Sequence, residues 1–406
     1  MNDHVLIVGA SHAGVQLAAR LRERGHEGPV TLVGEESPLP YHRPPLSKAY
    51  LAGSVTAESM SLRPETFYSS KAITLVPGAR VEEIDMAAGT AHCLTGQSFD
   101  FDHVALTTGA RVRRLDIPGA DLAGVVYLRD MQDATGLREA LGPVRRAVVV
   151  GGGFIGLEAA AVLRQRGVDV TVVEAADRLM ARSVSEEMSA FFAGVHRDRG
   201  SRVLLETGVV AMNGREGRVE EVVLDDDSTV PADLVVVGIG VVPRTELADR
   251  MGLAVDGGIL VDRQARTSDP RVVAAGDATV LPHPLEPATF LRLESVQNAT
   301  DQADIAAATI CGQTAAYDSV PWFWSDQFDL KLQMAGAAIG YDEVVLRGSA
   351  PDRLTVLCYR RGQLVAGECV NAGADFVAVR RALATGKSFP QDMAADTSIK
   401  LKSLLS

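Results

Sequence analysis

The feature of this sequence that most constrains its fold is a glycine-rich strand–turn–helix pattern that occurs twice, 142 residues apart. Each copy begins with a short apolar run, and the two turns span residues 9–14 and 151–156. An apolar-periodic helix follows each turn and is expected to end just before Gly25 or Gly167, ahead of a second apolar run. Such a βαβ unit is typical of dinucleotide-binding folds, in which the helix N-terminus offers N–H donors to a pyrophosphate. The repeat therefore predicts two Rossmann-like domains.

The second turn matches the pattern G-x-G-x-x-G in full. Its glycines, Gly151, Gly153 and Gly156, allow a tight turn, close approach of a pyrophosphate and close packing of helix on strand. Glu174 lies 23 residues after Gly151, at the end of the second strand. A carboxylate there can accept a hydrogen bond from a ribose 2′-hydroxyl, so we expect a dinucleotide site.

The first turn departs from this pattern at its middle position. Ser11 stands between Gly9 and Gly14 where a glycine is usual. Serine restricts the backbone more than glycine does and adds a hydroxyl beside the expected phosphates. Glu35 is the candidate ribose acid here, with Glu36 as the alternative.

Several shorter patterns place further elements. Apolar runs at residues 104–106 and 234–237 end in glycine-bearing turns, as buried parallel strands do. Ser183 and Glu186 have the spacing of a capping box, which predicts that a helix begins there. Asp277 follows another apolar run and is either a ligand contact or a turn aspartate.

The chain changes character after Pro321. We expect a small third domain of α+β type: strands near residues 333–336, 344–347, 354–360 and 365–370, a turn at 361–362, and a helix at 375–385.

Composition narrows the classes of function. The net charge of −12 argues against nucleic acid or an anionic membrane surface as a main partner. The most apolar window, residues 147–163, contains three consecutive glycines and a glutamate, so we expect no membrane span, and the first residues do not resemble a signal peptide. The four cysteines form no C-x-x-C pattern, which predicts a reduced, cytoplasmic chain without a metal site or a redox dithiol.

Two longer segments are the most specific in the sequence: P-Y-H-R-P-P-L-S-K-A-Y-L at residues 40–51 and W-F-W-S-D-Q at residues 322–327. With the two glycine turns, they make the chain resemble the NADH-dependent ferredoxin reductases of putidaredoxin-reductase type, within the glutathione-reductase-like superfamily of two-dinucleotide flavoproteins. The resemblance covers nearly the whole chain. It departs at Ser11 and at Thr107, which replaces alanine in the usual A-T-G turn.

The resemblance implies an α/β fold with an FAD domain at residues 1–110 and 245–320, an NAD domain at 111–244 and a C-terminal α+β domain at 321–406. It implies one tightly bound FAD per chain and NADH as the electron donor. The implied partner is a 2Fe–2S ferredoxin, which would in turn serve a haem monooxygenase or a ring-hydroxylating dioxygenase.

The resemblance also implies which residues contact the cofactors. Besides the first glycine turn, the expected FAD contacts are Ala13, Glu35, Arg43, Lys48, Val81, Arg129, Asp277 and Val296. Besides the second turn, the expected NAD contacts are Ile155, Glu174, Arg182 and Gly240.

Three residues are expected to act in the reaction. Lys48 near the flavin would stabilise negative charge that builds as a hydride arrives, unless it is simply a solvated lysine. Glu158 would pair with Lys48 and shape the nicotinamide pocket. Trp324 would lie against the isoalloxazine while Trp322 packs in the core, although core packing of both tryptophans is the alternative.

Other functions of the same fold remain as alternatives. Relatives that cycle a cysteine near the flavin carry that thiol close to the first specific segment, where this chain has none. NADH oxidases and small-molecule reductases, such as those acting on monodehydroascorbate, share the fold. A non-enzymatic flavoprotein similar to apoptosis-inducing factor is the alternative from another class.

Overall fold

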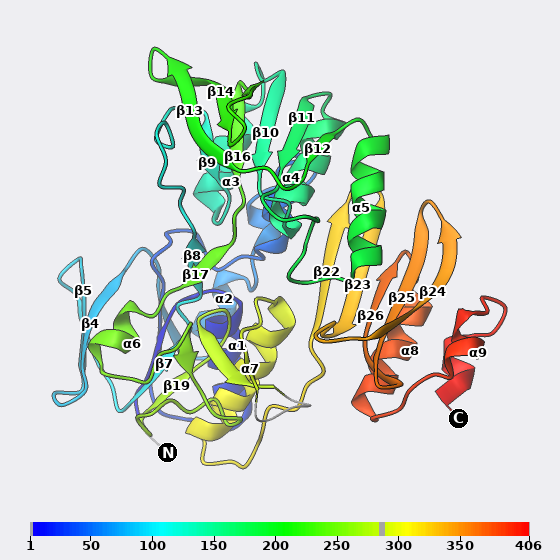
Figure 1. Ribbon diagram of the computed structural model, residues 1–406. Coiled ribbons are helices and arrows are strands. Elements are labelled where there is room, and N and C mark those ends of the chain that lie inside the picture. The colour runs from blue at the N-terminus through cyan, green and yellow to red at the C-terminus, as the bar shows by residue number, and fades with distance from the viewer. Residues whose placement is uncertain (1–2, 284–288, 406) are drawn as a thin grey trace. The chain divides into compact units, whose positions relative to one another are not determined.

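The computed structural model describes residues 3–283 and 289–405. The chain divides into two compact units (Figure 1). The first unit comprises Met1–His42, Glu58–Arg111 and Val242–Pro321, and the second comprises Arg43–Ala57, Val112–Val241 and Trp322–Ser406. The predicted NAD-binding and C-terminal regions thus belong to one unit, and the boundaries of three separate domains remain a prediction.

A five-stranded parallel sheet forms the centre of the first unit, in the order β19-β7-β1-β2-β3. Its strands are mostly apolar, because a parallel sheet is covered on both faces. The central elements are β1 (Val5–Val8), α1 (His12–Glu23), β2 (Val30–Val33), β3 (Ile73–Val76), β7 (His103–Leu106), β19 (Val272–Ala274) and α7 (Val296–Ile310). The others are η2 (Glu58–Met60), α2 (Glu65–Ser70), β4 (Val81–Asp85), β5 (Thr90–Cys93), β6 (Ser98–Asp100), α6 (Glu246–Arg250), β18 (Ile259–Leu260), β20 (Thr279–Pro282) and β21 (Phe290–Leu291).

A second five-stranded parallel sheet, in the order β12-β11-β10-β16-β9, belongs to the second unit. Its elements are η1 (Pro44–Ser47), β9 (Val125–Tyr127), α3 (Met131–Ala140), β10 (Arg146–Val150), α4 (Phe154–Gln165), β11 (Asp169–Val173), α5 (Glu186–Asp198), β12 (Arg202–Leu204), β13 (Val209–Arg215), β14 (Arg218–Leu224), β15 (Thr229–Pro231) and β16 (Leu234–Val237). The chain passes between the units at β8 (Ala110–Val112) and β17 (Val241–Pro243). Both predicted Rossmann-like folds are confirmed.

The region after Pro321 is an antiparallel sheet with helices, as predicted, and its order is β22-β23-β26-β25-β24. Its elements are β22 (Trp322–Gln327), β23 (Leu330–Gly336), β24 (Glu343–Ala350), β25 (Arg353–Arg360), β26 (Gln363–Val370), α8 (Gly373–Ala384), α9 (Gln391–Ala395) and η3 (Leu401–Leu405). The predicted turn joins β25 to β26, with φ of +51° at Arg361 and +73° at Gly362. Strand β22 is an addition to the predicted elements.

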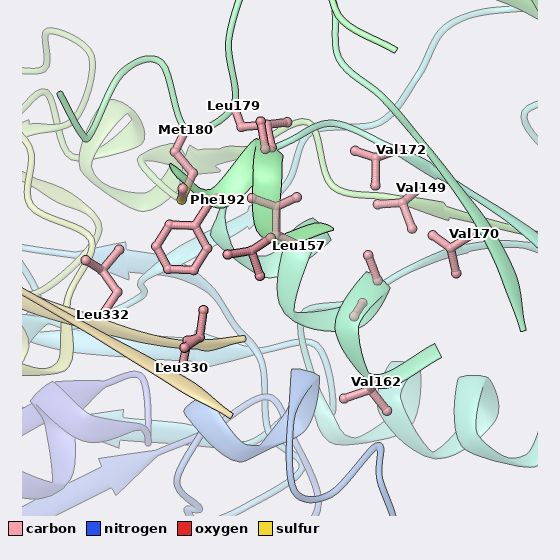
Figure 2. Packing of buried hydrophobic residues seen from close by; sticks show 14 of the residues in the cluster. Val149, Leu157, Val162, Val170, Val172, Leu179, Met180, Phe192, Leu330 and Leu332 are labelled. Carbon is pink, nitrogen blue, oxygen red and sulfur yellow. The ribbon is translucent and has the colours of Figure 1, made fainter. Parts of the chain in front are cut away.

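One hydrophobic core joins the parallel and antiparallel sheets of the second unit (Figure 2). Leu157 of α4 and Phe192 of α5 lie in it together with Leu330 and Leu332 of β23. The side chains of β22 alternate between two faces, and Phe323 packs on Phe154 of α4 with ring centroids 4.8 Å apart. This packing brings one face of β22 against α4, the helix that follows the second glycine turn.

The start of α5 corrects the capping-box prediction. Ser185, not Ser183, is the N-cap, and its hydroxyl accepts from the Met188 N–H at 3.2 Å. The same hydroxyl donates to the buried Glu368 carboxylate of β26 at 2.6 Å, and the Ser185 N–H donates to it at 2.8 Å. The N-cap residue thus also makes a contact distant in sequence, which local spacing does not reveal.

All four cysteines are free thiols: Cys93, Cys311, Cys358 and Cys369. In the hairpin of β25 and β26, Cys358 lies opposite Ala366 and Cys369 lies opposite Thr355. In the described part of the chain, no helix combines the length and the apolarity that a membrane span requires.

Candidate functional site

The second glycine turn has the geometry that a bound pyrophosphate requires. Gly151 has a φ of +104°, and a Cβ on it would lie 2.5 Å from the Gly238 carbonyl oxygen. A Cβ on Gly156 would lie 2.4 Å from the Gly151 carbonyl oxygen. A Cβ on Gly153 would come no closer than 3.9 Å to any atom beyond its chain neighbours. The outer glycines are therefore required by the protein itself, whereas the middle one leaves space for a ligand.

The first turn repeats this geometry and accommodates both departures from the family pattern. Gly9 has a φ of +117°, and a Cβ on it would lie 2.1 Å from the Thr107 carbonyl oxygen. Ser11 has a φ of −126°, which any residue adopts without strain. The Thr107 hydroxyl donates to the Gly9 carbonyl oxygen at 2.8 Å, so it ties the end of β7 to the turn. Neither substitution disturbs the turn.

Helix α4 begins without a side-chain cap, since its N-cap is Gly153. By contrast, Asp130, Ser185 and Ser295 cap α3, α5 and α7, respectively, with a side-chain oxygen. The N–H groups of the first turn of α4 therefore remain available to an anion. The open space at Gly153 and these donors fit the pyrophosphate of a dinucleotide.

Glu174 lies directly after β11 and holds the second turn in place. Its carboxylate accepts from the Gly152 N–H at 2.6 Å and from the Ala176 N–H at 2.8 Å. A carboxylate oxygen has two lone pairs, so each oxygen keeps one for a ribose hydroxyl. The Arg178 guanidinium donates to the carbonyl oxygens of Ala181 at 2.6 Å and Val184 at 2.9 Å. Because Arg178 is engaged within its own loop, it is poorly placed to bind a 2′-phosphate.

The other predicted NAD residues lie in the same unit. An Arg182 nitrogen would lie 3.2 Å from a Cβ on Gly240, so these two positions adjoin. Ile155, in the first turn of α4, keeps 47% of its surface exposed although it is a large apolar residue. Whether they contact NAD remains a prediction.

Glu35, the predicted ribose acid of the first unit, follows β2 and pairs with two arginines. Arg80 Nη1 lies 3.0 Å from its carboxylate, and Arg244 forms a second ion pair. Partial burial raises the pKa of Glu35, but the two guanidinium groups outweigh burial and lower the pKa of this carboxyl below its usual value. Glu35 is therefore an ionised acceptor at neutral pH.

The remaining residues predicted to contact FAD fall in both units. Ala13, Val81, Asp277 and Val296 belong to the first unit, where Ala13 packs beside Gly276, the residue before Asp277. Arg43, Lys48 and Arg129 belong to the second unit, where Arg43 donates to the Arg129 carbonyl oxygen at 3.0 Å. Their contacts with FAD remain predictions.

A buried polar cluster of the second unit surrounds Glu158. This residue of α4 is 1% exposed, and Lys48 Nζ lies 2.9 Å from its Oε1. The Ser47 hydroxyl donates to Oε2 at 2.5 Å, and the Ser325 hydroxyl donates to Oε1 at 2.6 Å. Burial is the largest influence and holds the pKa of Glu158 above its usual value, while Lys48 and the two hydroxyls act in the opposite direction.

The expected pairing of Lys48 with Glu158 is thus present, and the solvated-lysine alternative does not fit a side chain that is 16% exposed. Lys48 also donates to the Pro44 carbonyl oxygen at 3.2 Å. Ser47 and Ser325 were not among the residues predicted from the sequence. The signal was available, because Ser47 directly precedes Lys48 and Ser325 directly follows Trp324 in the two specific segments.

Trp322 and Trp324 lie on the face of β22 opposite Ser325, with ring centroids 5.6 Å apart. Trp322 packs on Phe376 of α8 at 6.0 Å, and the Arg380 guanidinium lies 5.2 Å from the centre of its indole. Trp322 is thus half-buried against α8, and core packing as its role remains a prediction. The contact of Trp324 with a flavin remains a prediction.

Comparisons with known proteins agree with this geometry. The family model described as pyridine nucleotide-disulphide oxidoreductase matches residues 3–303, and the model described as reductase C-terminal matches residues 322–405. The chain is 45% identical to rhodocoxin reductase of Rhodococcus erythropolis, over 98% of this chain and 93% of that protein. It is 40% identical to the anthranilate 1,2-dioxygenase system ferredoxin–NAD(+) reductase component of Burkholderia cepacia, over 99% of both proteins. The crystal structure of the ferredoxin reductase for the CYP199A2 system of Rhodopseudomonas palustris superposes with a TM-score of 0.96, at 44% identity and 99% coverage of both chains.

Proposed function

This chain belongs to the pyridine nucleotide-disulphide oxidoreductase family, and we propose that it is an FAD-dependent reductase that passes electrons from NADH to a 2Fe–2S ferredoxin. The observation that carries this function is the presence of two glycine turns in one chain, one complete and one with Ser11 at its middle position, each followed by an acidic residue. One dinucleotide site suits FAD and the other suits NADH. The ferredoxin would serve a haem monooxygenase or a ring-hydroxylating dioxygenase.

When bound, FAD accepts a hydride from NADH and releases the electrons one at a time. The first turn and Glu35 would hold its adenosine half, and Arg43, Lys48 and Arg129 would approach the rest. The second turn, Glu174, Arg182 and Gly240 would hold NADH. In this proposal, these residues bind and orient the cofactors.

Lys48 and Glu158 have the electrostatic role in this proposal. Lys48 supplies a positive charge at the point where negative charge develops. Glu158 holds the Lys48 ammonium in place from a buried position, at a separation of 2.9 Å. Trp324 would cover one side of the site, with its neighbour Trp322 anchored on α8.

A cytoplasmic location is part of the proposal. Four free cysteines, three of them buried, fit a reducing compartment. Ferredoxins and the oxygenases that they serve would then be available in the same compartment.

The proposed function is tested first on the purified protein. We expect it to be yellow, to release FAD and not FMN on denaturation, and to lose its colour when NADH is added without oxygen. FAD is expected because a pyrophosphate is needed to use the glycine turn. A colourless protein that does not bind added FAD would refute the proposal.

NADH should be preferred over NADPH, and Glu174→Ala should reduce this preference. The Glu174 carboxylate accepts from a ribose 2′-hydroxyl but repels a 2′-phosphate. Loss of the carboxylate should narrow the difference in activation free energy between NADPH and NADH by about 1–3 kcal/mol, which is the usual contribution of a hydrogen bond to a charged group. The measurement is the ratio of kcat/KM for the two cofactors.

The matched control is another acid of the same loop. Asp177 is exposed and lies three residues after Glu174, so its removal changes the net charge of the loop by the same amount. Asp177→Ala should leave the ratio unchanged. Equal kcat/KM values for NADH and NADPH in the unmodified protein would show that the acid is misassigned.

A further inference from the structure

The hydrogen bonds around Glu158 continue beyond its direct partners. The Ser325 hydroxyl, which donates to Glu158, lies 3.3 Å from Gln327 Nε2, and Gln327 Oε1 lies 3.0 Å from His196 Nε2. The side chains of Ser325, Gln327 and His196 are fully buried. A continuous buried chain of hydrogen bonds therefore begins at the Lys48–Glu158 pair beside α4, passes through β22 and ends at His196 of α5.

The donors in this chain have one consistent direction. A carboxylate can only accept, so Ser325 uses its single hydrogen for Glu158 and receives the Gln327 amide N–H on a lone pair. The Gln327 nitrogen also lies 3.8 Å from the Met180 sulphur, a weak acceptor, which favours this orientation of the amide. The Gln327 oxygen can then only accept, so His196 must carry its hydrogen on Nε2.

The other ring nitrogen of His196 supports the same assignment. Nδ1 is buried and has no hydrogen-bond partner among the residues that the structure describes. A lone pair left without a partner there costs less than a buried N–H or a charged ring. Burial lowers the pKa of His196, so the ring is neutral. The chain thus ends in a histidine with one defined tautomer.

We propose that Gln327 and His196 are positioning residues of the Lys48–Glu158 pair, whose aligned donors, acting through Ser325, keep Glu158 ionised. An ionised Glu158 in turn retains Lys48 as a fixed ammonium group. The inference rests on the proposed function, because it assigns these residues to NADH-dependent flavin reduction. It also gives a role to two uncharged polar side chains that have no surface exposure.

Burial and the neighbouring groups of Glu158 have opposite effects on its ionisation. Burial favours the neutral form of Glu158, and the charged group that faces it is Lys48, directly after η1. Strands β10, β11 and β16 present apolar side chains toward α4, including Val149 and Val172. On β22, Asp326 lies on the face opposite Ser325. Lys48 is the cation that faces the buried Glu158 carboxylate. Oriented hydrogen-bond donors therefore have a large influence on whether Glu158 is ionised, because each bond polarises the next.

The test is the pH dependence of flavin reduction by NADH in the holoenzyme, measured by stopped flow. Ser325→Ala removes a direct donor, and we expect the acid limb of the profile to move up by about one pH unit. Gln327→Met keeps the side-chain volume but removes the polarising donor, and we expect a shift of about half a unit in the same direction.

Ser189→Ala is the matched control, since Ser189 is a buried serine of α5 outside this chain of hydrogen bonds. Its profile should coincide with that of the unmodified enzyme. An unmoved profile in Gln327→Met, or an equal shift in Ser189→Ala, would overturn the inference. If Gln327→Met does not fold, the position of the proton on the His196 ring still tests the inference.

A second measurement does not depend on activity. Nitrogen-15 NMR of histidine-labelled protein, with His196 assigned through His196→Gln, should show a neutral ring with its proton on Nε2 that does not titrate while the protein is folded. A proton on Nδ1 would reverse the chain and overturn the inference. If NADH fails to reduce the flavin of the unmodified enzyme, the proposed function fails, whereas the tautomer result still decides the direction of the hydrogen bonds.

Discussion

Replacing Lys48 with methionine should slow the reduction of the flavin by NADH about a hundredfold, which is the usual loss when one group that stabilises developing charge is removed. The affinity for NADH should change little. Lys48 lies 2.9 Å from Glu158 and is mostly buried, so its charge acts in a medium that screens it weakly. The charge that it opposes develops mainly in the transition state. Stopped-flow reduction over a range of NADH concentrations separates the rate from the affinity.

A double variant guards against a purely structural explanation. Lys48→Met leaves the Glu158 carboxylate without its cation, which is costly in a buried position. Adding Glu158→Gln removes that unpaired charge and should restore stability but not the rate of reduction. Lys331→Met, at an exposed lysine of β23, is the matched control and should behave like the unmodified enzyme. An unchanged rate in Lys48→Met would return Lys48 to a structural role.

The second large effect concerns the electron acceptor. NADH-dependent reduction of cytochrome c should be slow with the enzyme alone and rise strongly when a bacterial 2Fe–2S ferredoxin is added. The ferredoxin-dependent rate should then fall about tenfold or more as salt rises, while reduction of the flavin by NADH barely changes. Such ferredoxins are typically acidic, and this chain carries a net charge of −12, so docking requires a local cationic surface.

The region after Pro321 contains arginines that are candidates for that cationic surface. Arg380 and Arg381 are exposed on α8, and Arg380 lies over the rings of Trp322 and Phe376. Arg380→Ala should therefore lower the ferredoxin-dependent rate and its sensitivity to salt, with flavin reduction unaffected. Arg215→Ala, at an exposed arginine of β13, is the control. If no ferredoxin accelerates the reaction at low salt, while oxygen accepts electrons readily, an NADH oxidase replaces the proposed function.

The sequence predicted the parts of this protein that depend on local pattern. The glycine turns at Gly9 and Gly151 are recognisable because a positive φ and a close carbonyl contact admit no other residue. Glu174 was recognised for the same kind of reason, because the end of a strand places its side chain beside the turn. The strands after Pro321 were recognised from their apolar alternation.

The rest depends on contacts between residues distant in sequence. Glu158 gains its partner Ser325 from a position 167 residues away, and His196 meets Gln327 across 131 residues. No local sequence pattern predicts either hydrogen bond. Strand β22 was missed for a related reason, since its tryptophans suggested a site more strongly than a strand. Ser183 was preferred to Ser185 because the buried Glu368, 183 residues from the true cap, is invisible to local spacing.

A single-turnover experiment without oxygen tests the central claim most directly. The enzyme is reduced with one equivalent of NADH and mixed with an excess of oxidised 2Fe–2S ferredoxin, and the absorbance of both proteins is followed. We predict that the flavin is reoxidised and that two ferredoxins are reduced for each NADH consumed, because each 2Fe–2S centre accepts one electron. A ferredoxin that stays oxidised beside a reduced flavin, which then reoxidises as soon as oxygen is admitted, would contradict the account.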